Sequence, residues 1–85
     1  RRGAAEAIGL TAHGDARSSK VVGQRLDALK LPSSVTVGAI LRGDDVLIAH
    51  GNVVVEANDH VILFLTDRTQ ISAVEKLFAV GFGFI

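Results

Sequence analysis

Residues 61–65 are five consecutive apolar residues, and this run constrains the fold more than any other segment. Successive side chains of a β-strand point to opposite faces of the sheet, so a strand that is apolar at every position is typical of one buried on both faces. The run is far shorter than the roughly 20 apolar residues that cross a bilayer. We therefore expect residues 61–65 to form a central strand that is covered on both sides.

Four other segments have the pattern of strands. Residues 6–12 alternate apolar with small or polar residues, which indicates a strand with one buried face. Residues 35–42 predict a second strand, and residues 46–49 its hairpin partner. A short strand is expected at residues 53–55. Turns rich in Gly, Asp and Asn separate these segments, at residues 43–45, 51–52 and 56–59.

Two segments have the period of a helix. The first carries apolar residues four and three positions apart, at Val22, Leu26 and Leu29. Ser18 or Ser19 could cap its start, and Pro32 ends it, since the residue before a proline is disfavoured in helical geometry. The second helix is predicted to follow a cap at Asp67, with Gln70 completing a capping box. Its buried stripe is expected to be Ile71, Val74, Leu77 and Phe78.

These elements predict an α+β fold, a small mixed or antiparallel sheet with two helices in the order β-α-β-β-β-α. The 85 residues allow one domain only. We expect residues 1–5 to be a linker from a preceding domain and residues 79–85 to be an apolar tail. The sequence does not begin with methionine, so it could be part of a longer protein.

The charge and cysteine content exclude several classes of function. Nine basic and nine acidic residues cancel, so the chain has no field that attracts nucleic acid, and direct membrane insertion is not expected. A neutral surface also does little to keep copies of the chain apart. The chain has no cysteine, which rules out disulfides and thiolate chemistry.

No catalytic or metal-binding constellation is expected. His13, His50 and His60 lack the short spacing of a zinc site, and no cysteine joins them. The aspartates of the turns are in positions where a carboxylate usually accepts hydrogen bonds from backbone amides. No serine lies in a Gly-x-Ser-x-Gly elbow. We therefore predict that the chain is not an enzyme, with no catalytic residues and no metal.

One group of polar residues could serve a ligand. Arg42, His50 and Asn52 lie in and around the predicted hairpin and could surround an apolar floor between paired domains. The alternative is that they are ordinary polar groups of the hairpin and its turns. If Arg42 is a ligand residue, its replacement by alanine should leave the fold intact.

The order and spacing of several segments resemble a known family. These segments are Val22-Gly23, Leu26, Leu29-Lys30-Leu31-Pro32, residues 37–40, Arg42-Gly43-Asp44, Val46-Leu47-Ile48, Glu56-Ala57-Asn58-Asp59 and the apolar strand to Phe64. The pattern is similar to the C-terminal regulatory domains (RCK-C or TrkA-C domains) of potassium-conductance regulators. In that family a glycine precedes the turn aspartate, whereas this chain has Asn58, one of the few residues that tolerate positive φ.

The resemblance implies a regulatory and dimerisation domain of a potassium-uptake regulator, in the cytoplasm at the inner face of the plasma membrane. Its implied partners are a second copy of the chain, the rest of the regulator and a TrkH-like membrane potassium channel. NAD or an adenine nucleotide would be bound by a Rossmann domain, whose glycine-rich fingerprint is absent here, so no cofactor is expected in this chain. Some relatives bind cyclic dinucleotides or calcium, but those ligand patterns do not match this sequence. The alternative function is a stand-alone sensor of a nucleotide or an ion.

Overall fold

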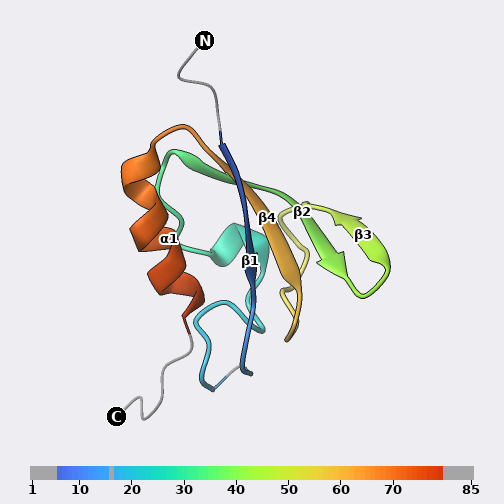
Figure 1. Ribbon diagram of the computed structural model, residues 1–85. Helices are drawn as coiled ribbons and strands as arrows, with labels where there is room; N and C mark the ends of the chain where they lie inside the picture. The colour runs from blue at the N-terminus through green and yellow to red at the C-terminus, as the bar shows by residue number, and fades with distance from the viewer. Residues whose placement is uncertain (1–5, 16, 80–85) are drawn as a thin grey trace.

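The computed structural model describes residues 6–15 and 17–79 and shows a four-stranded sheet with one helix (Figure 1). The strands are β1 (Glu6–Thr11), β2 (Val35–Arg42), β3 (Asp45–Ile48) and β4 (His60–Leu65). Two short 3₁₀ helices, η1 (Leu26–Ala28) and η2 (Arg68–Gln70), precede β2 and the helix α1 (Ile71–Phe78) respectively. The predictions of a linker at residues 1–5 and of most of the tail at residues 79–85 lie outside the described residues.

The sheet is antiparallel throughout, with the strand order β1-β4-β2-β3. The strands predicted from residues 6–12, 35–42, 46–49 and 61–65 are confirmed to within about one residue at each end, a margin within which element boundaries are commonly uncertain. β4 is central, as its continuous apolar run predicted, because it pairs with β1 on one side and β2 on the other. Gly43 has a φ of 60° in the two-residue turn between β2 and β3, where a right-handed strand twist favours a glycine at the first position.

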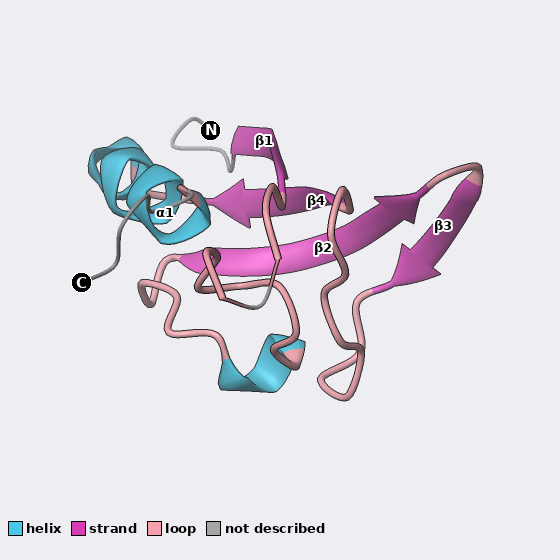
Figure 2. Ribbon diagram, turned by 90° about the horizontal axis from the view of Figure 1, so that it is seen from below, coloured by secondary structure: helices cyan, strands magenta, loops and turns pink. Residues whose placement is uncertain are grey.

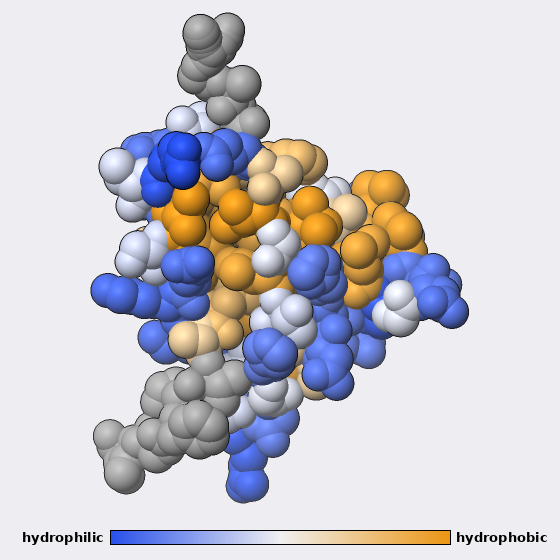
Figure 3. Space-filling view, in the orientation of Figure 1, coloured by the Kyte–Doolittle hydropathy of each residue, from blue (hydrophilic) through white to orange (hydrophobic). Residues whose placement is uncertain are grey.

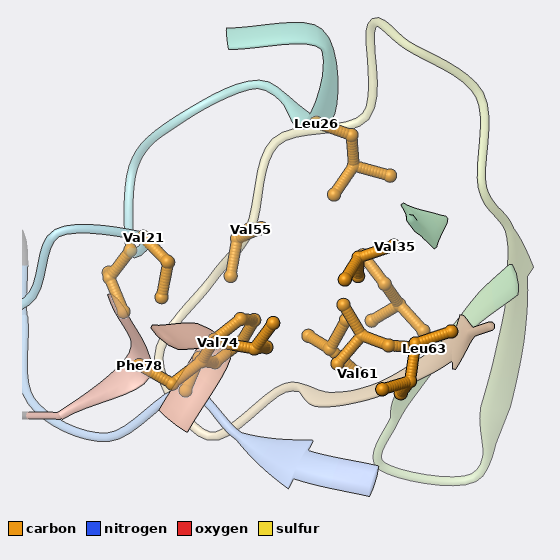
Figure 4. Close-up of a cluster of buried hydrophobic side chains, with 12 residues drawn as sticks. Val21, Leu26, Val35, Val55, Val61, Leu63, Val74 and Phe78 are labelled. Carbon is orange, nitrogen blue, oxygen red and sulfur yellow. The ribbon is translucent and has the colours of Figure 1, made fainter. Parts of the chain in front are cut away.

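The core fills one side of the sheet (Figure 4). Val61, Leu63 and Leu65 of β4 are almost completely buried there, against Val74 and Phe78 of α1. The loops that connect β1 to β2 and β3 to β4 complete this layer (Figure 2). They contribute the buried side chains Val21, Val22, Leu26 and Val55.

The second side of the sheet is not covered by the described residues. Phe64 is 44% exposed although it lies in the central strand. The prediction that residues 61–65 are buried on both faces is therefore wrong for the outer face. The ring of Phe64 lies over Gly38 of the neighbouring strand, where a Cβ atom would fall 2.1 Å from the ring. This contact covers part of Phe64 and requires a glycine at position 38 unless the ring moves.

The first predicted helix is wrong. Residues 19–31 form an irregular segment of bends and turns in which the only helix is the 3₁₀ helix η1. Gly23 has a φ of 86°, which is incompatible with a continuing α-helix. The backbone N–H groups of Gly23 and Leu26 donate to the carbonyls of Val55 and Val53, at 2.7 and 2.9 Å, instead of to their own turn.

Pairing with the loop after β3 has therefore replaced the helix. The same pairing explains why residues 53–55 are not a strand of the sheet: Val54 forms an isolated antiparallel bridge with Arg25. The apolar spacing did identify buried residues, because Val22 and Leu26 do face the core. The spacing of the apolar residues therefore predicted which side chains face the core, but the α-helical backbone conformation that it indicated is wrong.

The C-terminal helix is confirmed, with a modified start. The side chain of Asp67 accepts a hydrogen bond from the N–H of Thr69 at 3.0 Å, so it caps η2, which leads directly into α1. Val74 and Phe78 are buried, while Ile71 and Leu77 are half-buried against the core. No helix among the described residues is long and apolar enough to span a membrane.

The η1 turn provides a test of the core. Leu26 is 8% exposed and belongs to the core, whereas Ala28 in the same turn is exposed. We expect Leu26→Asp to lower the free energy of unfolding by several kcal/mol, because it places an unpaired charge among apolar side chains. Chemical denaturation followed by circular dichroism measures the change. Ala28→Asp is the matched control and should have little effect; equal losses for both variants would contradict the packing of Leu26.

Candidate functional site

Arg42, the first of the residues singled out in the sequence, forms a bidentate ion pair with Asp59. Its Nε and Nη2 donate to the two carboxylate oxygens of Asp59 at 2.9 and 2.7 Å. Asp59 is 1% exposed and Arg42 is about one-third exposed, so the pair lies at the border of the core. Bidentate pairing of a guanidinium with a carboxylate is among the stronger polar contacts in proteins.

The same guanidinium makes two further contacts. Nη2 donates to the carbonyl of Val54 at 2.9 Å, and Nη1 lies 3.2 Å from Oε2 of Glu56. Arg42 thus joins the end of β2 to the loop that returns from β3 to β4. Most of its hydrogen-bonding capacity is already used within the chain, which favours a structural role over a free ligand-binding one.

The turn at residues 56–59 presents Asp59 to this arginine. The N–H of Glu56 donates to Oδ2 of Asp59 at 2.8 Å, and Asn58 has a φ of 72°. This conformation confirms that asparagine supports the turn in place of the family's glycine. The turn is also joined to the end of β1, because Ala12 and residues 58–59 exchange backbone hydrogen bonds of 2.7 and 2.8 Å.

The environment of Asp59 keeps its carboxylate ionised. Burial alone raises the pKa of Asp59, but the hydrogen bonds from Arg42 and from the Glu56 N–H oppose burial and leave that pKa below its ordinary value. A carboxyl with a lowered pKa in the folded state contributes stability above its ordinary pKa of about 3.9. That contribution is lost as the pH falls through the lowered pKa.

His50 and Asn52 are exposed in the turn that follows β3. The N–H of His50 donates to the carbonyl of Ile48, and the carbonyl of His50 accepts from the N–H of Val53. Arg42 is the strand partner of Asp45, at the other end of β3, and its guanidinium reaches the carbonyl of Val54 in the loop that follows Asn52. The described part of the chain also contains no pocket. Their role in binding a ligand stays a prediction.

The histidines do not converge in the described residues. His60 lies on β4, where its Nδ1 is 3.2 Å from the hydroxyl of Thr11, while His13 and His50 are exposed in separate loops. No group of three or more His, Asp or Glu side chains within residues 6–15 and 17–79 is arranged to hold a metal ion.

The outer face of the sheet is the most distinctive surface of the molecule. The prediction that residues 61–65 are covered on both sides did not anticipate the exposure of β4 on this face. We call it the open face and define it by its large apolar residues Leu41, Val46, Ile48, Ile62 and Phe64. Val46 and Ile48 on β3 are 64% and 63% exposed. Apolar surface is visible where Figure 1 places β3, on the right of the view (Figure 3).

An apolar surface of this kind typically marks an interaction site. The register places its members side by side, because Leu41 pairs with Val46 and both lie on the same face as Ile62 and Phe64. The arrangement offers no reactive group, so it is suited to association and not to chemistry.

Comparisons with known proteins identify a matching family and several similar proteins. Residues 16–79 match the model of the TrkA-C domain family. The chain is 60% identical over 84 residues to the Trk system potassium uptake protein TrkA of Halomonas elongata, covering 99% of this chain and 18% of that protein. It is 55% identical over 78 residues to the TrkA protein of Vibrio alginolyticus, covering 92% of this chain and 17% of that protein.

A third relative is matched along the full chain. The identity to the TrkA protein of Haemophilus influenzae is 42% over 85 residues, which cover 100% of this chain and 19% of that protein. The chain thus spans less than a fifth of the length of these curated relatives.

The ion pair yields a prediction that differs from the sequence-based one. We expect Arg42→Ala to lower the free energy of unfolding by about 3 kcal/mol at neutral pH, because it leaves the carboxylate of Asp59 buried without its partner. This substitution should therefore destabilise the fold. The loss should shrink in acid, since the stabilisation of the unchanged chain disappears as the pH falls through the lowered pKa of Asp59. Urea denaturation over a pH series measures both effects.

Arg25→Ala is the matched control. Arg25 also pairs with an aspartate, Asp27, at 2.6 Å, but both side chains are about half exposed. Its removal should change stability little, since exposed pairs contribute little net free energy. An Arg42→Ala variant that is as stable as Arg25→Ala at neutral pH would show that Arg42 is free for another role.

Proposed function

The chain belongs to the TrkA-C domain family, and on that basis we propose that it is a regulatory domain of a protein that controls potassium uptake. The 60% identity to a Trk system potassium uptake protein over 99% of the chain carries this proposal. The names of the three relatives describe a role in potassium uptake, and none names a reaction.

The regulatory role that we propose works through association. A second copy of the chain is the first proposed partner, supported by the open face and by a net charge of zero that gives copies little reason to repel each other. The other proposed partners are the remainder of a TrkA-like protein and a TrkH-like membrane potassium channel. Such a protein would act in the cytoplasm, at the inner face of the plasma membrane.

Nucleotide binding would belong to a different part of that longer protein. The 85 residues contain no Gly-x-Gly-x-x-Gly segment between a strand and a helix, which is the element that holds the pyrophosphate of NAD. We therefore assign NAD or an adenine nucleotide to a Rossmann domain elsewhere and derive no role for it in this chain.

A domain exchange tests the regulatory role. The matching 84 residues of the Halomonas elongata protein would be replaced by this chain, and potassium uptake would be measured at limiting potassium in cells that lack their own copy. We expect the chimera to restore uptake and its regulation, and deletion of the segment to impair them. A chimera that carries Leu26→Asp controls for folding. Normal, regulated uptake by the deletion variant would contradict the proposal.

We also propose that this domain senses a ligand once two copies are paired. The exposed side chains of His50 and Asn52 are free of hydrogen bonds to other described residues and lie in one turn, while Arg42 would contribute its remaining N–H. Thermal unfolding with nucleotides and divalent ions tests this. We expect a rise in the unfolding midpoint that His50→Ala removes and that Lys20→Ala, at an exposed site elsewhere, retains; no rise with any ligand would contradict sensing by the chain.

A further inference from the structure

We propose that His60 makes the open face sensitive to pH: the face is covered by its partner when the imidazole is neutral and is released when the imidazole is protonated. This inference rests on the proposed function in taking the open face as the surface that is covered on association. It adds the residue through which protons act on that surface and the direction of their effect.

His60 is an ionisable residue on an otherwise apolar strand face. It is the first residue of β4, and its strand partners are Thr11 on β1 and Leu41 on β2. Directly paired residues and alternate residues of a strand share one face of a sheet, so His60 points to the same side as Leu41 and Ile62. A partner that covers these two apolar side chains therefore also removes water from the imidazole.

The imidazole is held close to the sheet. Its Nδ1 lies 3.2 Å from the hydroxyl of Thr11, and the ring lies over Gly9, where a Cβ atom would fall 3.0 Å from Cε1 and closer still to Nε2. A larger residue at position 9 would displace the ring. His60 is half-buried already in the single chain. A charge on this ring is consequently fixed in the open face.

β1 offers the imidazole no anionic partner. The residues of this strand that share the open face are uncharged: Ala7, Gly9 and Thr11. Glu6 is in the alternate register and lies 3.0 Å from Arg68. His13, which is exposed beyond the end of β1, has the same sign of charge as His60 when it is protonated.

The charged groups of the other strands are also directed elsewhere. Arg42 and Asp59 are next in sequence to residues of the open face, so they point to the opposite side, where they bind each other at 2.7 Å. Asp45 is the strand partner of Arg42 and shares that side, and Asp44 is exposed in the turn between β2 and β3. A protonated imidazole in the covered face would thus have no carboxylate opposite it among the described residues.

The cost of covering the face therefore depends on protonation. Burial disfavours the charged form of an imidazole, whereas the neutral ring keeps its hydrogen bond to Thr11 and otherwise adds to the apolar surface. By linkage, association is strongest where His60 is neutral and weakens as the pH falls and the free chain takes up a proton. Imidazoles gain their charge between pH 8 and 5. The pKa of Asp59 lies below its ordinary value, so the arginine pair stays intact in this range.

Self-association measured over a pH series tests the inference. Analytical ultracentrifugation at constant ionic strength should show a dissociation constant that rises about tenfold or more from pH 8 to pH 5.5 for the unchanged chain. His60→Gln, which is uncharged and can still bond to Thr11, should associate equally well at both pH values. The matched control His13→Gln removes an exposed histidine and should retain the pH dependence of the unchanged chain.

A permanent charge at the same position provides the opposite variant. His60→Lys should associate weakly at every pH, with circular dichroism confirming that the variant is folded. A folded His60→Lys variant that associates as strongly as the unchanged chain does at pH 8 would contradict the inference.

Nuclear magnetic resonance on the unchanged chain gives a readout that needs no variant. The ring protons of His60 should titrate at a lower pH in concentrated, associated samples than in dilute ones. An unchanged midpoint in samples that do associate, or a His60→Gln variant that keeps the full pH dependence, would overturn the role of His60 and leave the proposed association intact. A chain that stays monomeric at every pH and concentration would overturn both.

Discussion

The carboxylate of Asp59 is the constraint on which the arrangement of the loops depends. It is buried at the end of the turn that leads into β4, and Arg42 and the N–H of Glu56 both donate to it. Through Arg42 it joins the last residue of β2 to the returning chain at Val54. A buried carboxylate without such partners would be strongly unfavourable, so the hairpin and the loop can only adopt positions that bring the partners together.

This constraint also explains the segment that replaces the expected first helix. Once residues 51–55 are held beside the sheet, their carbonyls are available to the chain that precedes β2, and the N–H groups of Gly23 and Leu26 bond to them. A helix in that segment would satisfy its own backbone and leave those carbonyls without partners in a partly buried layer. The left-handed conformation of Gly23 allows the chain to follow the loop instead.

The parts of the fold that the sequence predicted are those governed by local pattern. Alternation defined β1 and β2, the Gly-Asp turn defined the hairpin, and the cap at Asp67 marked the start of the last helix. The segment around Leu26 failed because a spacing of three and four residues is also compatible with a loop whose apolar side chains all face the core. Backbone pairing with residues about 30 positions further along the chain decides between the helix and the loop. The local sequence pattern does not indicate such a pairing.

The candidate site shows the same division between local and distant information. Arg42 was identified as a polar residue of interest, but its partner Asp59 lies 17 residues further along the chain and was assigned only to a turn.

Likewise, the five apolar residues of β4 correctly indicated a central strand but did not reveal that its outer face is open, because burial of that face depends on what lies above it. A strand that is apolar on both faces can leave one of them exposed, and an exposed apolar face of this kind typically marks an interaction site. Thus the run that defines the centre of this fold also supplies two of the large apolar residues of the open face, Ile62 and Phe64.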